Sequence, residues 1–195
     1  MRYSRPMEDG NDPDRVWVER SQQGDRAAYT KLVERYQTPL YQFAFRLLND
    51  AALAQDVAQE ALARGWLKRA SFRWRHNARF STWLFQLARN AAIDLIRRRR
   101  ELSLDAVAHE PISPALDAAG AAQDKELGAR IAAAFAALPE AQRTATTLSE
   151  FHGMSAREIA IVLHCSTRSA ESHLYRGKQA LRVALADCWT DLHAR

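Results

Sequence analysis

Residues 72–100 read FRWRHNARFSTWLFQLARNAAIDLIRRRR, and this stretch decides the fold of the chain. Its apolar side chains recur at the i, i+3, i+4, i+7 spacing of a helix with one buried face. The positions on that face are Phe80, Trp83, Leu84, Leu87, Ala88, Ala91 and Leu95. A polar stripe of the same helix carries Gln86, Asn90, Asp94 and Arg97. Because amide, carboxylate and guanidinium groups read base edges and grip phosphates, the stretch predicts a helix that contacts nucleic acid.

Positive charge is concentrated around this helix. The whole chain carries a formal net charge of +5, but residues 61–100 hold 11 Lys/Arg against 1 acid, and residues 101–124 hold 5 acids and no Lys/Arg. A concentrated basic block is the electrostatic footprint of a polyanion partner. The alternative is a solvated, arginine-rich helix end. The aromatic side chains interleaved with the arginines favour the polyanion.

The composition favours an all-α chain in a reducing compartment. Only 7 Gly and 6 Pro are present in 195 residues, and strand-type alternation is hard to find. The two cysteines, Cys165 and Cys188, make no disulfide framework. No apolar run approaches the roughly 20 residues that span a bilayer, and the N-terminus lacks the apolar core of a signal peptide. We therefore expect a soluble, cytoplasmic protein.

Helical patterns divide the chain into two small domains. The predicted divisions are a polar tail over 1–14, a helical domain over 15–100, a linker over 101–124, a helical domain over 125–187 and a tail over 188–195. Pro111, Pro114 and Gly120, together with five acids, predict that the linker is flexible and acidic. A loop this long would be unusual inside one compact domain, which favours two.

Two clusters in the first domain have candidate binding roles. Asp56, Gln59 and Glu60 share the outward side of a predicted helix over 50–68, where the order D-x-x-Q-E favours a protein contact over a merely solvated face. Residues 70–79 have no helical stripe and end in a cluster of Arg73, Trp74, Arg75, His76, Asn77 and Arg79. Exposed aromatic and cationic side chains suit single-stranded bases, which stack for about 1–3 kcal/mol each. The alternative for Trp74 is that it closes the core.

The second domain carries a helix-turn-helix pattern. Ser155 and Glu158 form a predicted capping box, and a turn of three residues over 164–166 precedes a last helix over 167–186. The outer face of that helix mixes hydroxyl, imidazole and guanidinium groups, as major-groove readout does. Its residues are Arg168, Ser169, Glu171, Ser172, His173, Tyr175 and Arg176.

Together the two halves resemble the extracytoplasmic-function (ECF) sigma factors, small members of the bacterial sigma-70 family. The resemblance covers roughly residues 22–186 and rests on three motifs. They are AQDVAQEALARGW over 54–66, FSTWLFQLARNAAIDLIRRRR over 80–100 and LPEAQRTATTLSEFHGMSAREIAIVLHCSTRSAESHLYRGKQAL over 138–181. The second and third motifs, in this order with an acidic linker between them, form a specific signal, whereas a helix-turn-helix alone is a weak one.

The resemblance implies a role for each cluster. Asp56, Gln59 and Glu60 match a patch that docks on the clamp helices of the largest RNA polymerase subunit. The residues that match the −10 promoter contacts are Trp74, Arg75, His76, Asn77, Arg79, Phe80, Asn90, Asp94, Arg97 and Arg98, although the apolar stripe places Phe80 and Trp83 mostly in the core. The outer face of the last helix matches the −35 reader, and the linker matches a segment that threads the RNA channel of polymerase. An anti-sigma factor is an expected further partner, whereas no cofactor, metal, small-molecule substrate or membrane insertion is expected.

The chain departs from the family pattern at four positions. Glu171 and His173 stand where many relatives carry Lys or Arg, so the −35 sequence cannot be copied from them. A carboxylate accepts from cytosine N4 but repels phosphate. Ala61 and Gly65 make the predicted docking helix less bulky than usual.

Other classes of function explain this sequence less well. A sigma-like decoy that only binds an anti-sigma factor should have lost its base-reading side chains, which this chain keeps. A plain helix-turn-helix regulator leaves residues 72–100 without a purpose. The sequence contains no phosphate loop, nucleophile motif or metal-ligand spacing that would indicate an enzyme. A metal or redox sensor built from His164, Cys165 and His173 stays open, although a turn cysteine is usually a small buried hydrophobe.

Overall fold

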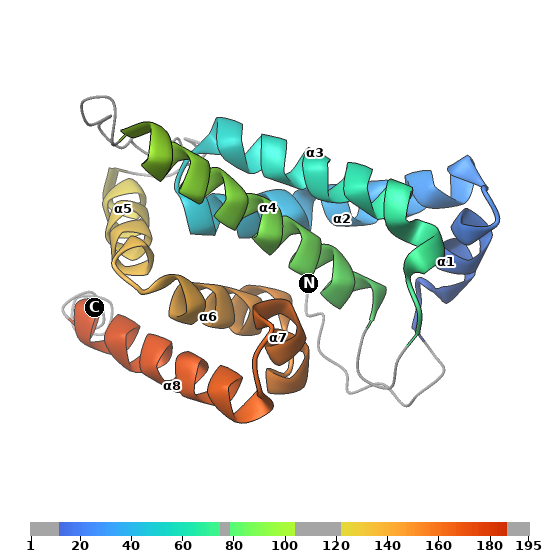
Figure 1. Ribbon diagram of the computed structural model, residues 1–195. Helices are drawn as coiled ribbons and strands as arrows, with labels where there is room; N and C mark the ends of the chain where they lie inside the picture. Colours follow the sequence, from blue (N-terminus) through green and yellow to red (C-terminus); the bar gives the residue numbers. More distant parts are fainter. Residues whose placement is uncertain (1–11, 75–78, 104–121, 187–195) are drawn as a thin grey trace.

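The computed structural model describes residues 12–74, 79–103 and 122–186, and over these residues the chain forms helices and no strand (Figure 1). The elements are α1 (Arg15–Gln22), α2 (Arg26–Leu48), α3 (Ala51–Lys68), the 3-10 helix η1 (Arg69–Ser71), α4 (Phe80–Ser103), α5 (Ala122–Ala136), α6 (Glu140–His152), α7 (Ala156–Leu163) and α8 (Thr167–Ala184). The all-α prediction is confirmed. No helix in the described segments is long and apolar enough to cross a membrane.

Local capping fixes most helix boundaries. The carboxylate of Asp25 accepts from the backbone N–H of Ala28 and starts α2, and the carboxylate of Asp50 accepts from that of Leu53 and starts α3. Such caps satisfy backbone donors that a helix leaves without partners. Asn49, in the left-handed conformation at φ 52°, ends α2. Each of these boundaries depends on residues within one helical turn.

Helix α2 runs through Pro39 without a break. Proline inside a helix removes one hydrogen bond and costs about 3 kcal/mol. On either side of it, Tyr36 and Leu40 are buried in the core at 5% and 0% exposure. Burial of each large side chain contributes roughly 1.5–3 kcal/mol, which offsets the proline and keeps the helix continuous.

Small residues let α3 approach α2 closely. The Tyr29 hydroxyl donates to the carbonyl of Leu62 at 2.6 Å. A Cβ placed on Gly65 would lie 2.5 Å from that hydroxyl, and Ala61 is fully buried. Ala61 and Gly65 are therefore packing residues on the buried side of α3, and their small size serves the fold.

In the C-terminal half, a glycine likewise allows two helices to pack closely. Helices α6 and α8 meet at Gly177, where a Cβ would lie 2.3 Å from Thr146 Oγ1. The predicted capping box of α7 is present, since Ser155 and Glu158 each bond the other's backbone N–H. His164, left-handed at φ 54°, ends α7 and opens the turn to α8. Helices α7 and α8 thus form the predicted helix-turn-helix.

The two halves share one hydrophobic core in this structure. Side chains of α6 and α7, among them Leu148, Ile159 and Val162, join the same buried cluster as those of α2, α3 and α4. The His152 ring lies 4.5 Å from the Phe85 ring and packs on Phe43 as well. Helix α7 packs on α4 and α6 packs on α2, and in Figure 1 α8 lies on the far side of α6. The division into two domains stays a prediction, and the structure adds that the halves are in contact.

The predicted linker, 101–124, begins before α4 ends and ends after α5 has begun. Helix α4 extends to Ser103 and α5 begins at Ala122, so each takes three residues of the predicted linker, and residues 104–121 lie outside the described residues. The predicted N-terminal tail is also shorter than expected, because Asp14 is only 1% exposed and stands at the start of α1.

Candidate nucleic-acid interface

The acidic-amide patch lies on the open face of α3. Asp56, Gln59 and Glu60 are all exposed, whereas Val57 and Ala58 on the opposite face are buried. Glu60 pairs with Arg64 one turn later, at 2.5 Å between Oε1 and Nε. The alternation of the two faces follows from the helical repeat, and it leaves the patch free of contact with the core.

Trp74 closes part of the core in this structure. Its ring packs edge-on against Phe72 at 5.0 Å between centroids, and the Arg15 guanidinium lies 5.9 Å from it. The ring remains partly exposed, so both interpretations of this residue keep a physical basis. The candidate base-capture residues Arg75, His76 and Asn77 lie outside the described residues.

Phe80 is a core residue. Its ring is fully buried and packs against Phe72, Trp83 and Tyr36 at 5.4, 5.5 and 6.3 Å between centroids. A ring enclosed in this way does not reach a nucleic-acid base in this structure. The apolar stripe, which placed Phe80 mostly in the core, predicted its position better than the match to the −10 contacts did.

The polar stripe of α4 is partly open. Asn90 and Asp94 are half-buried, and Arg97 and Arg98 are exposed near the C-terminal end of the helix. Asp94 lies 4.0 Å from Arg64 of α3. Cationic side chains near a helix C-terminus are stabilised by the helix dipole, and they are the groups that grip phosphates.

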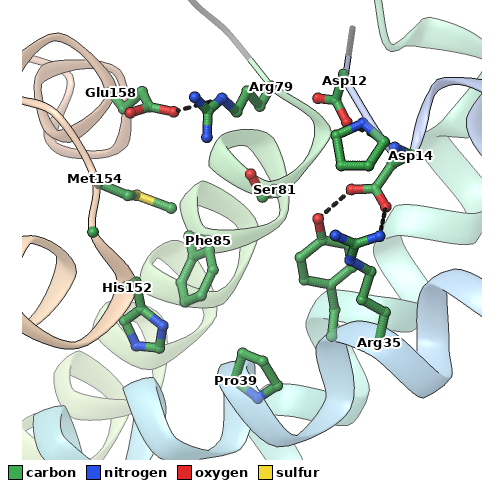
Figure 2. A pocket seen from close by; sticks show the side chains of 13 residues that line it. Asp12, Asp14, Arg35, Pro39, Arg79, Ser81, Phe85, His152, Met154 and Glu158 are labelled. Atoms are coloured by element: carbon green, nitrogen blue, oxygen red, sulfur yellow. Dashed lines mark hydrogen bonds and ion pairs between the residues drawn. The ribbon is translucent and has the colours of Figure 1, made fainter. Parts of the chain in front are cut away.

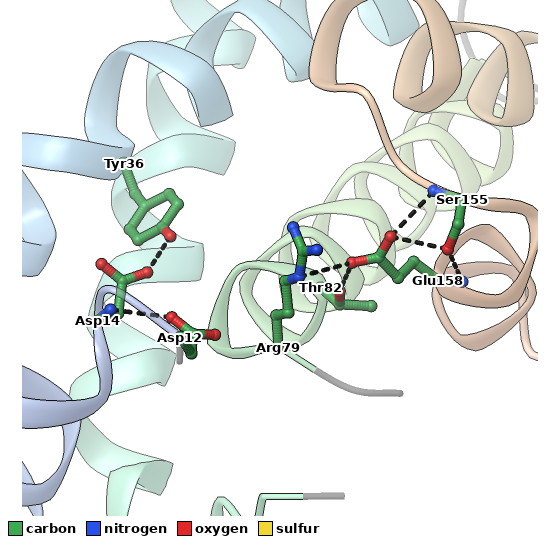
Figure 3. A network of polar contacts seen from close by, with 7 residues as sticks. All are labelled: Asp12, Asp14, Tyr36, Arg79, Thr82, Ser155 and Glu158. Carbon is green, nitrogen blue, oxygen red and sulfur yellow. Dashed lines mark hydrogen bonds and ion pairs between the residues drawn. The ribbon is translucent and has the colours of Figure 1, made fainter. Parts of the chain in front are cut away.

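Arg79 lies against the C-terminal half. Its Nε is 3.4 Å from Oε1 of Glu158 on α7, and Thr82 donates to the same oxygen at 3.3 Å (Figure 3). The other carboxylate oxygen of Glu158 accepts from the Ser155 backbone N–H at 2.9 Å. Sequence reasoning identified Glu158 as a capping residue, but gave no signal for its second partner, which lies on another helix.

A cavity of about 60 Å³ lies between the halves near this ion pair (Figure 2). On its N-terminal side, Tyr36 donates to the carboxylate of Asp14, and Arg35 pairs with Asp14 at 3.0 Å. Burial raises the pKa of Asp14 in spite of these partners. On the other side, burial and the nearby Arg46 charge lower the pKa of His152 to about 4, so its imidazole is neutral at neutral pH.

The predicted −35 reader is open to solvent. On α8, Arg168, Glu171, Ser172, Tyr175 and Arg176 are exposed, and Ser169 and His173 are half-buried. Ser166 caps this helix by accepting from the Ser169 N–H. Helix α8 itself lies on the side of α6 that is away from α2, α3 and α4 (Figure 1). A rigid, capped helix with an exposed polar face can enter a major groove.

The turn before α8 offers no metal cage in this structure. Among the described residues, no three His, Cys, Asp or Glu side chains gather as a metal site. Cys165 is a half-buried free thiol 3.4 Å from the carbonyl oxygen of Ser166, and His164 lies beside Gln86 of α4.

The chain matches two family models in the order that its halves predict. Residues 32–101 match sigma-70 region 2, and residues 128–181 match sigma-70 region 4. The first span holds α4 and the patch on α3, and the second holds the helix-turn-helix.

Curated relatives match over most of their length. RNA polymerase sigma-H factor of Pseudomonas aeruginosa is 34% identical over 184 residues, covering 88% of this chain and 93% of the relative. ECF RNA polymerase sigma-E factor of Escherichia coli is 31% identical over 182 residues, covering 86% and 92%. The solved structure of CnrH, in complex with the cytosolic domain of CnrY, matches with a TM-score of 0.68 at 26% identity, over 90% of this chain and 99% of that one. This chain therefore belongs to the sigma-70 family of RNA polymerase sigma factors, in its extracytoplasmic-function group.

Proposed function

We propose that this chain is a dissociable subunit of RNA polymerase that directs core enzyme to its own set of promoters. The observation that carries the proposal is the distribution of the three candidate surfaces. The candidate docking patch lies on α3, the polar stripe on α4 and the candidate −35 reader on α8, and each has side chains exposed to solvent. A protein of this family needs all three together, and neither a decoy nor a plain DNA-binding regulator does.

Promoter melting is the proposed task of the N-terminal half. Extruding a base from a duplex costs a few kcal/mol, which stacking and pocket contacts must return. Residues 74–79 are the proposed capture loop, with Trp74 as its aromatic group. Arg97 and Arg98 supply a sequence-independent grip on phosphates, and Asn90 and Asp94 are the proposed base readers beside them.

Recognition of the −35 element is the proposed task of α8. Arg176 suits a bidentate contact with guanine O6 and N7, and Glu171 suits cytosine N4. Arg168, Ser169, Ser172, His173 and Tyr175 complete the proposed reading face. The acidic Glu171 favours a −35 sequence that differs from those read by relatives with a cation there.

Control by an anti-sigma factor is the proposed regulation. CnrH, to which this chain is similar, is solved together with the cytosolic domain of CnrY. Asp56, Gln59 and Glu60 are exposed and belong to the polymerase-binding surface, so a partner that covers them blocks transcription. We propose that the protein works in the cytoplasm as an initiation factor, without a catalytic role or cofactor of its own.

Run-off transcription with purified core polymerase tests the proposal. Genomic fragments upstream of transcripts induced by overexpression serve as templates. We expect discrete run-off products with core plus this protein, and none with core alone. The Arg176→Ala variant should lose products from templates that depend on the −35 element, whereas Arg182→Ala, an exposed change near the end of the same helix, should keep them. No promoter-specific product above core alone would reject the proposal.

A further inference from the structure

Helix α1 lies beside the 3-10 helix η1, through which the chain leaves α3 toward the proposed capture loop. The side-chain amide of Gln22, at the end of α1, donates to two carbonyls, that of Arg69 at 3.0 Å and that of Phe72 at 2.9 Å. An amide nitrogen carries two N–H donors, so these bonds use both of them. Arg69 donates in return to the carbonyl of Ser21 at 2.7 Å. Three hydrogen bonds therefore fasten η1 and Phe72 to α1.

The Phe72 ring supports the aromatic residues on both sides of the capture loop. It is 5% exposed and lies 5.4 Å from the Phe80 ring and 5.3 Å from the Trp83 ring, both in the first turn of α4. The Trp74 ring, two residues along the chain, packs edge-on against it at 5.0 Å. The backbone of Phe72 is extended, at ψ 134°, where η1 ends. A shift of Phe72 would therefore move Trp74 with it.

Trp74 depends on this support because its polar edge is not held. Its indole N–H is buried and has no hydrogen-bond partner among the described residues. A buried N–H without a partner is unfavourable, so this edge gives the ring no anchor. A further contact of the ring is with α1, where the Arg15 guanidinium lies 5.9 Å from the ring centroid. The position of Trp74 thus depends on Phe72 and on α1.

A stacking ring that is in place before binding need not be ordered on binding, and such preorganisation raises affinity. We propose that Gln22 is a positioning residue for base capture: through the carbonyls of Arg69 and Phe72 it holds the Phe72 ring, which presents Trp74 to the single-stranded −10 element. Helix α1 lies before residue 32, where the match to sigma-70 region 2 begins, so that match assigns it no part. The capture step rests on the proposed function, whereas the placement of Trp74 by Gln22 does not.

The variant Gln22→Met removes the two donors and little else. Methionine has a similar length and an unbranched chain but no N–H, so the carbonyls of Arg69 and Phe72 lose this partner. Gln23→Met is the matched control, because Gln23 is the next residue and is exposed. Trp74→Ala removes the proposed capture ring itself.

The first measurement needs neither DNA nor polymerase. The chain has 5 Trp, and labelling with 5-fluorotryptophan gives each a fluorine NMR signal, of which Trp74→Phe identifies the one from Trp74. In Gln22→Met we expect the Trp74 signal to move and sharpen toward that of a solvated indole. In Gln23→Met it should stay in place. An unchanged Trp74 signal in Gln22→Met would overturn the positioning role.

The second measurement is binding of a labelled single strand that carries the −10 element mapped from the run-off products, compared with strands that lack one base at a time. In the parent, loss of the captured base should weaken binding roughly 5- to 150-fold, the value of one base–aromatic stack. Gln22→Met should weaken binding of the intact strand roughly two- to tenfold, the cost of ordering one side chain on binding. It should leave binding of the strand without the captured base, and of −35 duplex, unchanged, whereas a general loss of folding would weaken both.

A double-variant cycle shows whether Gln22 acts through Trp74. In the Trp74→Ala background, Gln22→Met should have no further effect on strand binding, because the ring that it positions is gone. Equal losses of affinity in the two backgrounds would overturn the proposal, as would a Trp74→Ala variant that binds the strand as tightly as the parent. Absence of run-off products from the parent, alongside a Trp74 signal that moves in Gln22→Met, would instead reject the proposed function and leave the placement of Trp74 by Gln22 standing.

Discussion

The hydroxyl of Tyr29 lies directly against the backbone of Gly65, where a Cβ would be 2.5 Å away, and the hydroxyl is held there by its hydrogen bond to the carbonyl of Leu62. The contact sets the spacing of α2 and α3. It makes Gly65 a structural requirement of the helix that carries the proposed docking patch.

Gly65→Ala should therefore destabilise the protein although alanine favours helix. Overpacking of this kind costs about 1–3 kcal/mol, against about 1 kcal/mol gained in helix propensity. We expect a net loss of up to about 2 kcal/mol in the free energy of unfolding, measured by urea denaturation. Tyr29→Phe removes the clashing hydroxyl, so the two changes together should lose less than their sum. If the loss of unfolding free energy in the double variant equalled the sum of the two single losses, the contact of the Tyr29 hydroxyl with position 65 would not be the cause of the destabilisation.

Asp56→Ala with Glu60→Ala should weaken binding to core polymerase while leaving the fold intact. Both side chains are exposed, and the ion pair of Glu60 with Arg64 that is lost lies at the surface within one helix. We expect at least tenfold weaker affinity in a fluorescence assay with labelled core. Glu19→Ala with Glu34→Ala removes the same charge elsewhere and should bind normally. Equal affinity of both variants would mean that the patch is only a solvated face.

Arg176→Ala should weaken binding to −35 DNA by about 1–3 kcal/mol if its guanidinium makes a bidentate base contact. The loss should fall on the cognate sequence and be small on a scrambled one. Titrations at several salt concentrations distinguish the two roles, because a phosphate contact contributes to the salt slope on any sequence. An equal loss of affinity for both sequences would show that Arg176 contacts the DNA backbone and not a base. Arg182→Ala is the control variant on the same helix.

Stability should fall in mild acid because of His152. Its pKa is lowered from the usual 6.5 to about 4, so between these values the unfolded chain binds a proton that the folded chain does not. The contribution of His152 is fully present above pH 6.5 and is lost as the pH falls toward 4, by roughly 2–3 kcal/mol. Because the pKa of Asp14 is raised, its contribution to stability increases as the pH falls, which opposes the effect of His152. The effect of His152 is therefore measured by comparing the parent with a variant that lacks this side chain.

His152→Phe is that variant, because it fills the space beside Phe43 and Phe85 without a titrating group. Denaturation curves at pH 7, 6, 5 and 4 should show a shallower loss of stability for His152→Phe than for the parent. If the parent and His152→Phe lost stability equally as the pH fell, the group whose titration destabilises the fold would not be His152.

Local features of this fold were predictable from sequence. Ser155 marks a helix start because a cap bonds the backbone N–H three residues on, and the apolar stripe of α4 identified Phe80 and Leu84 as core. Periodicity records only which face of a helix is buried, and it needs no knowledge of the partner.

The contact between the halves was not predictable in the same way. The capping box accounts for one oxygen of Glu158, but Thr82, which donates to the other oxygen, is 76 residues away. Asp14 was assigned to a tail because its neighbours are polar and punctuated by proline, yet Tyr36 and Arg35 bury it. A polar residue is placed by partners that its own stretch of sequence does not contain.

Arg64 links the candidate docking patch on α3 to the polar stripe of α4. Its guanidinium lies 2.5 Å from Glu60 in the docking patch and 4.0 Å from Asp94 in the stripe of α4. Under the proposed function, a polymerase that drew Glu60 away would leave Arg64 to Asp94 and would lessen the negative charge of the proposed base-reading stripe. Thermodynamic coupling between two binding sites is reciprocal, so whatever factor docking adds to promoter affinity through Arg64, the promoter returns to docking. Under the proposed function, Arg64 would therefore let the assembled enzyme hold its subunit more tightly on a matching promoter than in solution.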